Sequence, residues 1–254
     1  MRTVDVKGIS IGSGSPKIVV PLVGKTEDEI INDAKHLAKI KCDLVEWRVD
    51  FFEQVTDFQA VAELSKKITE YLLDKPLLFT FRTKKEGGVT DLKDSDYFLL
   101  YQTMIQRGCL ELLDIELFMD EQLVKQTIQL AHSKGIKVIM CNHDFDRTPE
   151  KSEIISRLCR MQEMNADICK IAVMPQTSED VITLLAASNE MKKEHADRPI
   201  VTMSMGQLGL VSRLTGELFG SALTFGADRK ASAPGQISVV KLRQLLNLLS
   251  LSKN

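Results

Sequence analysis

The sequence has few cysteines and none of the arrangements that bind zinc or form a disulfide framework. Five cysteines occur in 254 residues, and no two of them make a CxxC pair. Disulfide frameworks use an even number of cysteines, and zinc ribbons use CxxC pairs. We therefore expect a reduced protein in which most cysteines are small core residues.

Long apolar runs and an excess of one charge are also absent. No run approaches the ~20 apolar residues of a membrane-spanning helix, and residues 1–10 (MRTVDVKGIS) lack the apolar stretch of a signal peptide. The 33 basic and 35 acidic residues give a net charge of −2, whereas general nucleic-acid binders are basic. The sequence predicts a cytoplasmic protein that binds neither membranes nor nucleic acid. A local cationic pocket for a small anion is compatible with this balance.

Nucleotide-binding motifs are missing too. Gly12 and Gly14 in GSGSP lack the third glycine of a dinucleotide fingerprint, and a proline and a predicted strand follow them. The chain has no GxxxxGK[ST] element either. We therefore expect no nucleotide cofactor.

The sequence does contain a regular alternation of short apolar strands with amphipathic helices. Such alternation is typical of a parallel sheet covered by helices, and eight repeats over about 250 residues favour a closed barrel. We predict one (β/α)8 TIM-barrel domain over residues 1–254, with an open doubly wound sheet as the fallback. A short N-terminal hairpin at 3–12 is expected to close the bottom of the barrel. The predicted strands begin at residues 17, 43, 76, 112, 137, 167, 199 and 221.

Capping residues locate three of the helix ends. Thr26 and Glu29 have the spacing of a capping box, in which each side chain accepts a backbone N–H. Thr148 is predicted as the N-cap of a later helix, with Pro149 at its first position. Gly135 follows the helix predicted over 120–134, where a left-handed C-cap is expected.

Polar residues interrupt several predicted strands near the same end. Alternate residues of a strand share a face, and the apolar face should pack on the helices, so Glu46 and Arg48 are expected to point into the barrel. Arg82, His143 and Lys170 lie near the ends of three further strands. Each of these residues alone is more often an ion-paired or structural group. Because TIM barrels carry their active sites at the C-terminal ends of the strands, the set predicts one pocket.

Lys170 stands in the apolar strand DICKIAV, where its amine could become reactive. At a pKa of ~10.4, about one lysine in 2,500 is neutral at pH 7. Burial beside Arg48 or Arg82 would lower that pKa, and a neutral amine adds to a ketone or aldehyde to give an imine. His143 is the candidate base for the neighbouring C–H, and Glu86 could orient its ring.

Two later segments add candidate substrate contacts. Arg213 falls early in a predicted helix after the seventh strand, where a guanidinium could hold a carboxylate in a bidentate pair. An exposed helix arginine is the simpler alternative. Residues 226–236 (GADRKASAPGQ) are predicted to form a mobile lid, in which Ser232 and Gln236 could contact hydroxyls or a carboxylate of the substrate.

Six segments in this order give the chain a specific resemblance. They are EWRVD at Glu46, PLLFTFRTKKEGG ending at Gly88, NHDF at Asn142, KIAVMPQ at Lys170, TMSMG at Thr202 and ASAPGQIS at Ala231. None is a strong signature alone. Together they resemble the type I 3-dehydroquinate dehydratase family of the shikimate pathway, over essentially the whole chain.

The resemblance implies a lyase that converts 3-dehydroquinate into 3-dehydroshikimate and water, in the biosynthesis of chorismate and the aromatic amino acids. It implies a homodimer with no metal and no organic cofactor. Lys170 matches the Schiff-base lysine, His143 the acid/base of a syn elimination, and Glu86 the carboxylate that orients His143. The substrate-binding positions match Glu46, Arg48, Arg82, Arg213, Ser232 and Gln236, with Met203 and Met205 as lining residues. Pro21 is a departure, because family members often carry a serine there as a substrate contact.

Three other functions stand as alternatives. A Schiff-base aldolase on the same barrel would use Lys170 similarly but break a C–C bond. A metal-dependent hydrolase would use His143, Asp144, Asp146 and Glu46 as ligands, but their spacing matches no standard ligand pattern. This function would also leave Lys170 without a role. A non-catalytic barrel serving as an interaction protein gives no reason for polar residues to cluster at one end.

Overall fold

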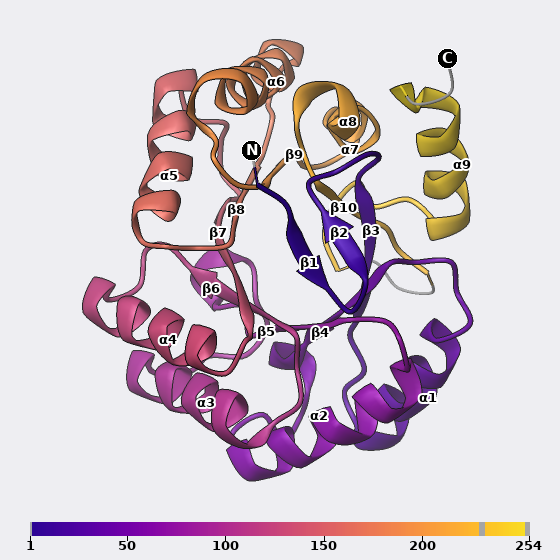
Figure 1. Ribbon diagram of the computed structural model, residues 1–254, viewed down its shortest axis with the longest axis vertical. Coiled ribbons are helices and arrows are strands. Elements are labelled where there is room, and N and C mark those ends of the chain that lie inside the picture. The colour runs from indigo at the N-terminus through magenta and orange to yellow at the C-terminus, as the bar shows by residue number, and fades with distance from the viewer. Residues whose placement is uncertain (1, 229–231, 252–254) are drawn as a thin grey trace.

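The computed structural model describes residues 2–228 and 232–251, which form a barrel of eight parallel strands (Figure 1). The strand order follows the sequence, except that the last strand lies beside the first. Ala222 N donates to Ile200 O at 2.8 Å, which joins the two remaining edges. The predicted (β/α)8 barrel is confirmed. Its strands are β3 (Lys17–Leu22), β4 (Leu44–Arg48), β5 (Leu77–Thr80), β6 (Leu112–Glu116), β7 (Lys137–Asp144), β8 (Ile168–Val173), β9 (Ile200–Ser204) and β10 (Leu223–Phe225).

Helices lie between successive strands and form the outer ring of the molecule (Figure 1). The α-helices are α1 (Glu27–Leu37), α2 (Phe58–Leu72), α3 (Asp94–Arg107), α4 (Glu121–Ser133), α5 (Lys151–Glu163), α6 (Ser178–Glu190), α7 (Leu210–Leu214), α8 (Gly216–Phe219) and α9 (Val239–Leu249). Shorter helical turns are η1 (Val49–Phe51), η2 (Lys84–Glu86) and η3 (Met191–His195).

Alternation along each strand divides the apolar residues into two cores. Trp47 and Phe79 belong to the outer core with the helices, and their rings meet edge-on at 5.7 Å. Leu44, Leu78 and Ile168 belong to the inner core. They occupy the N-terminal half of the barrel, and polar residues follow them on the same faces toward the C-terminal ends. The predicted division of strand faces is therefore confirmed.

The segment ahead of the barrel forms the expected hairpin, with strands β1 (Val4–Val6) and β2 (Ile9–Ile11). Val4, Val6 and Ile11 are buried in the inner core, against the start of the barrel strands. Figure 1 shows the hairpin lying across the barrel. The hairpin closes the bottom, so the open end lies where the strands finish.

The capping predictions were partly right. Thr26 Oγ1 accepts the backbone N–H of Glu29 at 3.3 Å, as expected. The Glu29 carboxylate, however, accepts the N–H of Lys25 at 2.8 Å, so the reciprocal half of the predicted box is shifted by one residue. Gly135 follows α4 with a φ of 75°, which confirms the predicted left-handed end.

The predicted start of α5 at Thr148 is wrong. The helix begins at Lys151, with Glu150 as its N-cap. Thr148 Oγ1 instead donates to Met174 O at 3.1 Å. This contact ties the loop after β7 to the end of β8, and it uses the hydroxyl that a helix cap would need.

Candidate active site

The predicted site residues converge where the barrel strands end. All of them except Arg213 line one cavity with a volume of about 40 Å³. The predicted residues in this wall are Glu46, Arg48, Arg82, Glu86, His143, Lys170, Met203, Met205, Ser232 and Gln236.

Lys170 lies in the middle of β8 with 3% of its side chain exposed. Its Nζ donates to Asp114 Oδ2 at 3.1 Å and lies 4.7 Å from the centre of the Phe225 ring. The amine is therefore enclosed in the barrel, as the sequence predicted. The sequence predicted cationic neighbours, Arg48 and Arg82, for this amine. The structure adds a carboxylate, because Asp114 contacts Nζ directly.

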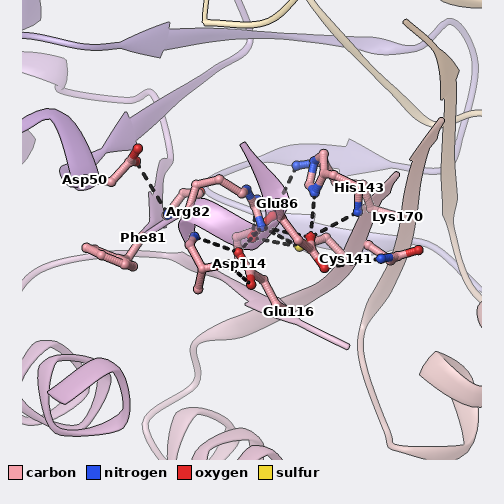
Figure 2. Close-up of polar contacts among 12 residues, drawn as sticks. Asp50, Phe81, Arg82, Glu86, Asp114, Glu116, Cys141, His143 and Lys170 are labelled. Carbon is pink, nitrogen blue, oxygen red and sulfur yellow. Dashed lines mark hydrogen bonds and ion pairs between the residues drawn. The ribbon is translucent and has the colours of Figure 1, made fainter. Parts of the chain in front are cut away.

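Two acidic residues that sequence reasoning missed, Asp114 and Glu116, lie on the inward face of β6 (Figure 2). Arg82 donates from Nη2 to Asp114 Oδ1 at 2.6 Å and from Nη1 to Glu116 Oε1 at 3.0 Å. Burial acts to raise the pKa of Asp114, but Arg82 and Lys170 together lower it to about 2. The signal was present in LLDIEL (112–117), where both acids alternate with apolar residues.

His143 lies near the end of β7, and Glu86 holds its ring. Glu86 Oε2 lies 2.9 Å from His143 Nδ1 and accepts the backbone N–H of His143 at 3.0 Å. Asn142 Nδ2 donates to Oε1 at 3.2 Å. The two N–H donors stabilise the carboxylate form of Glu86 and oppose burial, which raises its pKa. In the carboxylate form, Glu86 accepts the Nδ1 proton of a neutral imidazole. Nε2 is then the basic nitrogen.

Gly87 explains how Glu86 reaches this position. Gly87 ends η2 with a φ of 87°, and an added Cβ would lie 2.5 Å from the Phe145 ring. The Phe145 ring lies nearly parallel to that of His143, with centres 6.5 Å apart. A residue without a side chain therefore lets the Glu86 turn approach the imidazole and its aromatic neighbour.

Burial affects the two members of this pair in opposite ways. It lowers the pKa of His143 well below 6.5, and the cations Arg82 and Lys170 lower it further. Burial raises the pKa of Glu86, with Glu116 adding to the effect and Arg82 opposing it. At neutral pH the imidazole is therefore uncharged, as a general base has to be.

Glu46 and Arg48 both occupy inward positions on β4, as predicted, and each has its own partner. Arg48 donates from Nε and Nη2 to the two oxygens of Asp50 at 2.8 and 2.9 Å. Glu46 Oε1 accepts the hydroxyl of Thr80 at 3.0 Å. The Arg48 guanidinium is thus held in one orientation, while Glu46 faces the cavity without an ion-pair partner among the described residues.

Arg213 lies in α7 and is buried, unlike the exposed arginine of the simpler alternative. Its Nη2 donates to Pro234 O at 2.9 Å, and its buried Nε has no hydrogen-bond partner. Over residues 2–228 and 232–251, Arg48 and Arg82 have carboxylate partners, and Arg213 has none. Burial lowers its pKa to about 10, so it remains a cation at neutral pH with donors available for an anion.

Ser232 and Gln236 belong to the loop after β10 and contact each other. Ser232 N donates to Gln236 Oε1 at 3.0 Å, and Gln236 Nε2 donates to Ser232 Oγ at 3.1 Å. The loop is joined to the end of β9, because Gly206 N donates to Pro234 O at 3.3 Å. Residues 229–231 of the predicted lid lie outside the described residues.

Pro21 is not part of the wall around Lys170. It lines a second cavity of about 300 Å³, whose wall also includes His36 and Asp228.

Met203 and Met205 do line the Lys170 cavity, with exposed fractions of 6% and 1%.

The ligand set of the metal-hydrolase alternative is not assembled. Among the described residues, the side chains that could bind a metal ion together with His143 are those of Glu86 and Cys141. The guanidinium of Arg82 lies 2.9 Å from Cys141 Sγ and 3.6 Å from Glu86 Oε2. A fixed positive charge beside these atoms disfavours a second cation.

Comparison with known proteins identifies the family. A model described as type I 3-dehydroquinase matches residues 18–253. The chain belongs to the type I 3-dehydroquinase family. The 3-dehydroquinate dehydratase of Enterococcus faecalis is 53% identical over 253 residues, 100% of both chains. That of Bacillus subtilis is 51% identical over 98% of each. A crystal structure of the type I enzyme of Clostridium difficile with covalent modified comenic acid is 52% identical, covers 98% of both chains and has a TM-score of 0.95.

These similarities confirm the predicted family and, with it, the enzyme class of hydro-lyase. The aldolase and the non-catalytic barrel are thereby set aside. No helix in the described part of the chain combines the length and the apolar character needed to cross a membrane.

Proposed function

We propose that this chain converts 3-dehydroquinate into 3-dehydroshikimate and water through an imine between the substrate ketone and Lys170 Nζ. The observation that carries the proposal is a lysine, 3% exposed, whose amine shares one cavity with an uncharged His143. Amines in such sites add to carbonyl carbons. The names of the relatives support the choice of substrate.

Arg213 is the proposed partner of the substrate carboxylate. A buried guanidinium with donors to spare binds a carboxylate strongly, because the pair is charge-assisted and can be bidentate. Its contact with Pro234 O connects this binding to the loop over the cavity. Ser232, Gln236, Glu46, Arg48 and Arg82 are the proposed partners of the remaining polar groups of the substrate.

The chemistry follows from the two basic atoms that face the substrate. Nζ of Lys170 adds to the ketone carbon, and loss of water leaves a protonated imine. His143 Nε2 takes the proton from the adjacent carbon, and the C–H electrons move toward the nitrogen to give an enamine. The enamine then expels the hydroxyl group, which leaves as water with the proton held by His143, and a conjugated protonated imine remains. One water hydrolyses this imine, which releases 3-dehydroshikimate and restores the amine of Lys170. One imidazole serves both steps, so proton and hydroxyl leave from the same face. Glu86 keeps the imidazole in the required tautomer.

Turnover of 3-dehydroquinate tests the proposal directly. The product carries a conjugated enone, so its appearance is followed by ultraviolet absorbance. The Lys170→Met variant keeps the length of the side chain but has no amine, and we expect it to form no product. Activity should survive EDTA. A Lys170→Met variant with wild-type turnover, or no turnover by the wild-type chain, would contradict the proposal.

Three further expectations stay predictions. The homodimer comes from the resemblance, the cytoplasmic location from the composition of the N-terminal segment, and the single domain over residues 1–254 from the repeat pattern. Size-exclusion chromatography with light scattering tests the first, because a dimer has twice the 28.5 kDa of the chain.

A further inference from the structure

We propose that Asp114 is the counter-ion of Lys170 Nζ throughout the covalent cycle and acts as a positioning residue that keeps the imine protonated. This inference rests on the imine of the proposed function.

The two oxygens of Asp114 have separate partners (Figure 2). Oδ1 accepts Arg82 Nη2 at 2.6 Å and Cys141 Sγ at 3.0 Å. Oδ2 accepts Lys170 Nζ at 3.1 Å. Asp114 is fully buried, so the protein fixes the direction of the carboxylate and leaves one oxygen for the reacting nitrogen.

The reaction itself conserves the charge that Asp114 faces. An ammonium group and a ketone give a protonated imine and one water. Two of the three ammonium hydrogens leave with the carbonyl oxygen, and one stays on nitrogen. Nζ therefore carries one positive charge before and after this step, and the same carboxylate stabilises both forms. The charge is absent in the neutral amine that attacks the ketone, in the carbinolamine and in the enamine, and it returns when the hydroxyl departs.

A protonated imine matters because its positive nitrogen draws electrons from the adjacent C–H bond. Without a counter-ion, Nζ would share the cavity with the cations Arg82 and Arg48, which favour loss of its proton. Asp114 offsets that repulsion at 3.1 Å. The same contact stabilises the ammonium form of the free lysine, so Asp114 also opposes formation of the neutral amine that attacks the ketone.

Other charged and titratable groups surround this pair. They are Glu46 and Arg48 on β4, Arg82 after β5, Glu86 on η2, Glu116 on β6, and Cys141 and His143 on β7. The neighbouring residues of β9 and β10, Met203 and Phe225, are uncharged. Glu116 is the useful comparison, because it also pairs with Arg82 from β6 but has no contact with Lys170 among the described residues.

The test compares Asp114→Asn with Glu116→Gln, each combined with His143→Ala so that the imine forms without turnover. Borohydride quenching at timed intervals, followed by mass spectrometry, gives the rate of imine formation as a function of pH. We expect the midpoint of this profile to fall by about one to three pH units in Asp114→Asn, and by less than half as much in Glu116→Gln. With His143 present, kcat of Asp114→Asn should fall at least about tenfold, because fewer imines are protonated.

Two further variants guard against a merely structural effect. Asp114→Glu retains the charge, so its midpoint should stay close to that of the chain with Asp114 intact. Asp114→Ser is a second neutral variant, used if Asp114→Asn does not fold. An unchanged midpoint in the neutral variants, or an equal shift in Glu116→Gln, would overturn the inference. The absence of any adduct at Lys170 when Asp114 is intact would instead overturn the proposed function on which it rests.

Discussion

Acid should remove a defined part of the stability of this protein through Asp114. The ordinary pKa of this side chain is 3.8, and in the folded chain it is about 2. This lowering corresponds to about 2–3 kcal/mol, at about 1.4 kcal/mol per pKa unit. Because the pKa of the folded state is the lower one, this stabilisation is present above pH 3.8. It is lost as the pH falls toward 2.

The assay is urea unfolding of the wild type and of Asp114→Asn, followed by circular dichroism at several pH values between 5 and 2. The asparagine does not titrate, so the difference in the free energy of unfolding isolates the contribution of this carboxylate from those of the surface acids. We expect the difference to shrink by about 2–3 kcal/mol as the pH falls through the window. A Cys141→Ser control keeps both the carboxylate and a donor to it, and should follow the wild type. A difference that stays constant, or grows in acid, would show that the ionised Asp114 carboxylate does not stabilise the folded chain.

Further predictions concern the substrate. The value of kcat/KM should fall in acid, with the midpoint of the fall below pH 6.5. The base has to be neutral, and burial and nearby cations lower the pKa of His143. A midpoint above pH 6.5 would contradict this assignment. His143→Ala should lower kcat by about 10²–10⁴-fold, measured by enone absorbance, and a fully active variant would exclude the acid/base role. Arg213→Met should raise KM for 3-dehydroquinate about tenfold to a hundredfold, with a smaller rise in Arg213→Lys. An unchanged KM in both variants would show that the carboxylate binds elsewhere.

Much of the fold could be predicted, because it rests on periodicity. Each strand carries its own apolar run, and each helix its own apolar stripe, so the barrel follows from local patterns repeated along the chain. The inward positions of Glu46 and Arg48 follow from the same alternation. Lys170 was found as a polar residue in an otherwise apolar strand.

The interactions within the site were less accessible to sequence reasoning. Asp114 and Glu116 were overlooked because an acid in a short strand is usually ascribed to its exposed face, whereas in a closed barrel that face is the interior. The burial of Arg213 depends on the loop at Pro234, which lies 21 residues later. The predicted start of α5 was wrong for a related reason. The Thr148 hydroxyl donates a hydrogen bond to Met174 O, at the end of the neighbouring strand, and does not cap its own helix. Tertiary contacts of this kind leave no periodic pattern.

The substrate could not be derived from these residues alone. A buried lysine, a neutral histidine and an arginine with no carboxylate partner among the described residues define a site for an anionic ketone, which many compounds satisfy. The choice of 3-dehydroquinate comes from the resemblance of six segments and from the family to which the chain belongs.

The most direct test of the account is the identity of the atom that captures the substrate. The wild-type chain is incubated with 3-dehydroquinate, reduced with borohydride and digested, and the peptide that contains Lys170 is weighed by mass spectrometry. We predict that this peptide gains the mass of the reduced ligand, and that Lys170→Met gains none. An unmodified Lys170 peptide, or an adduct on a different lysine, would show that Lys170 is not the nucleophile.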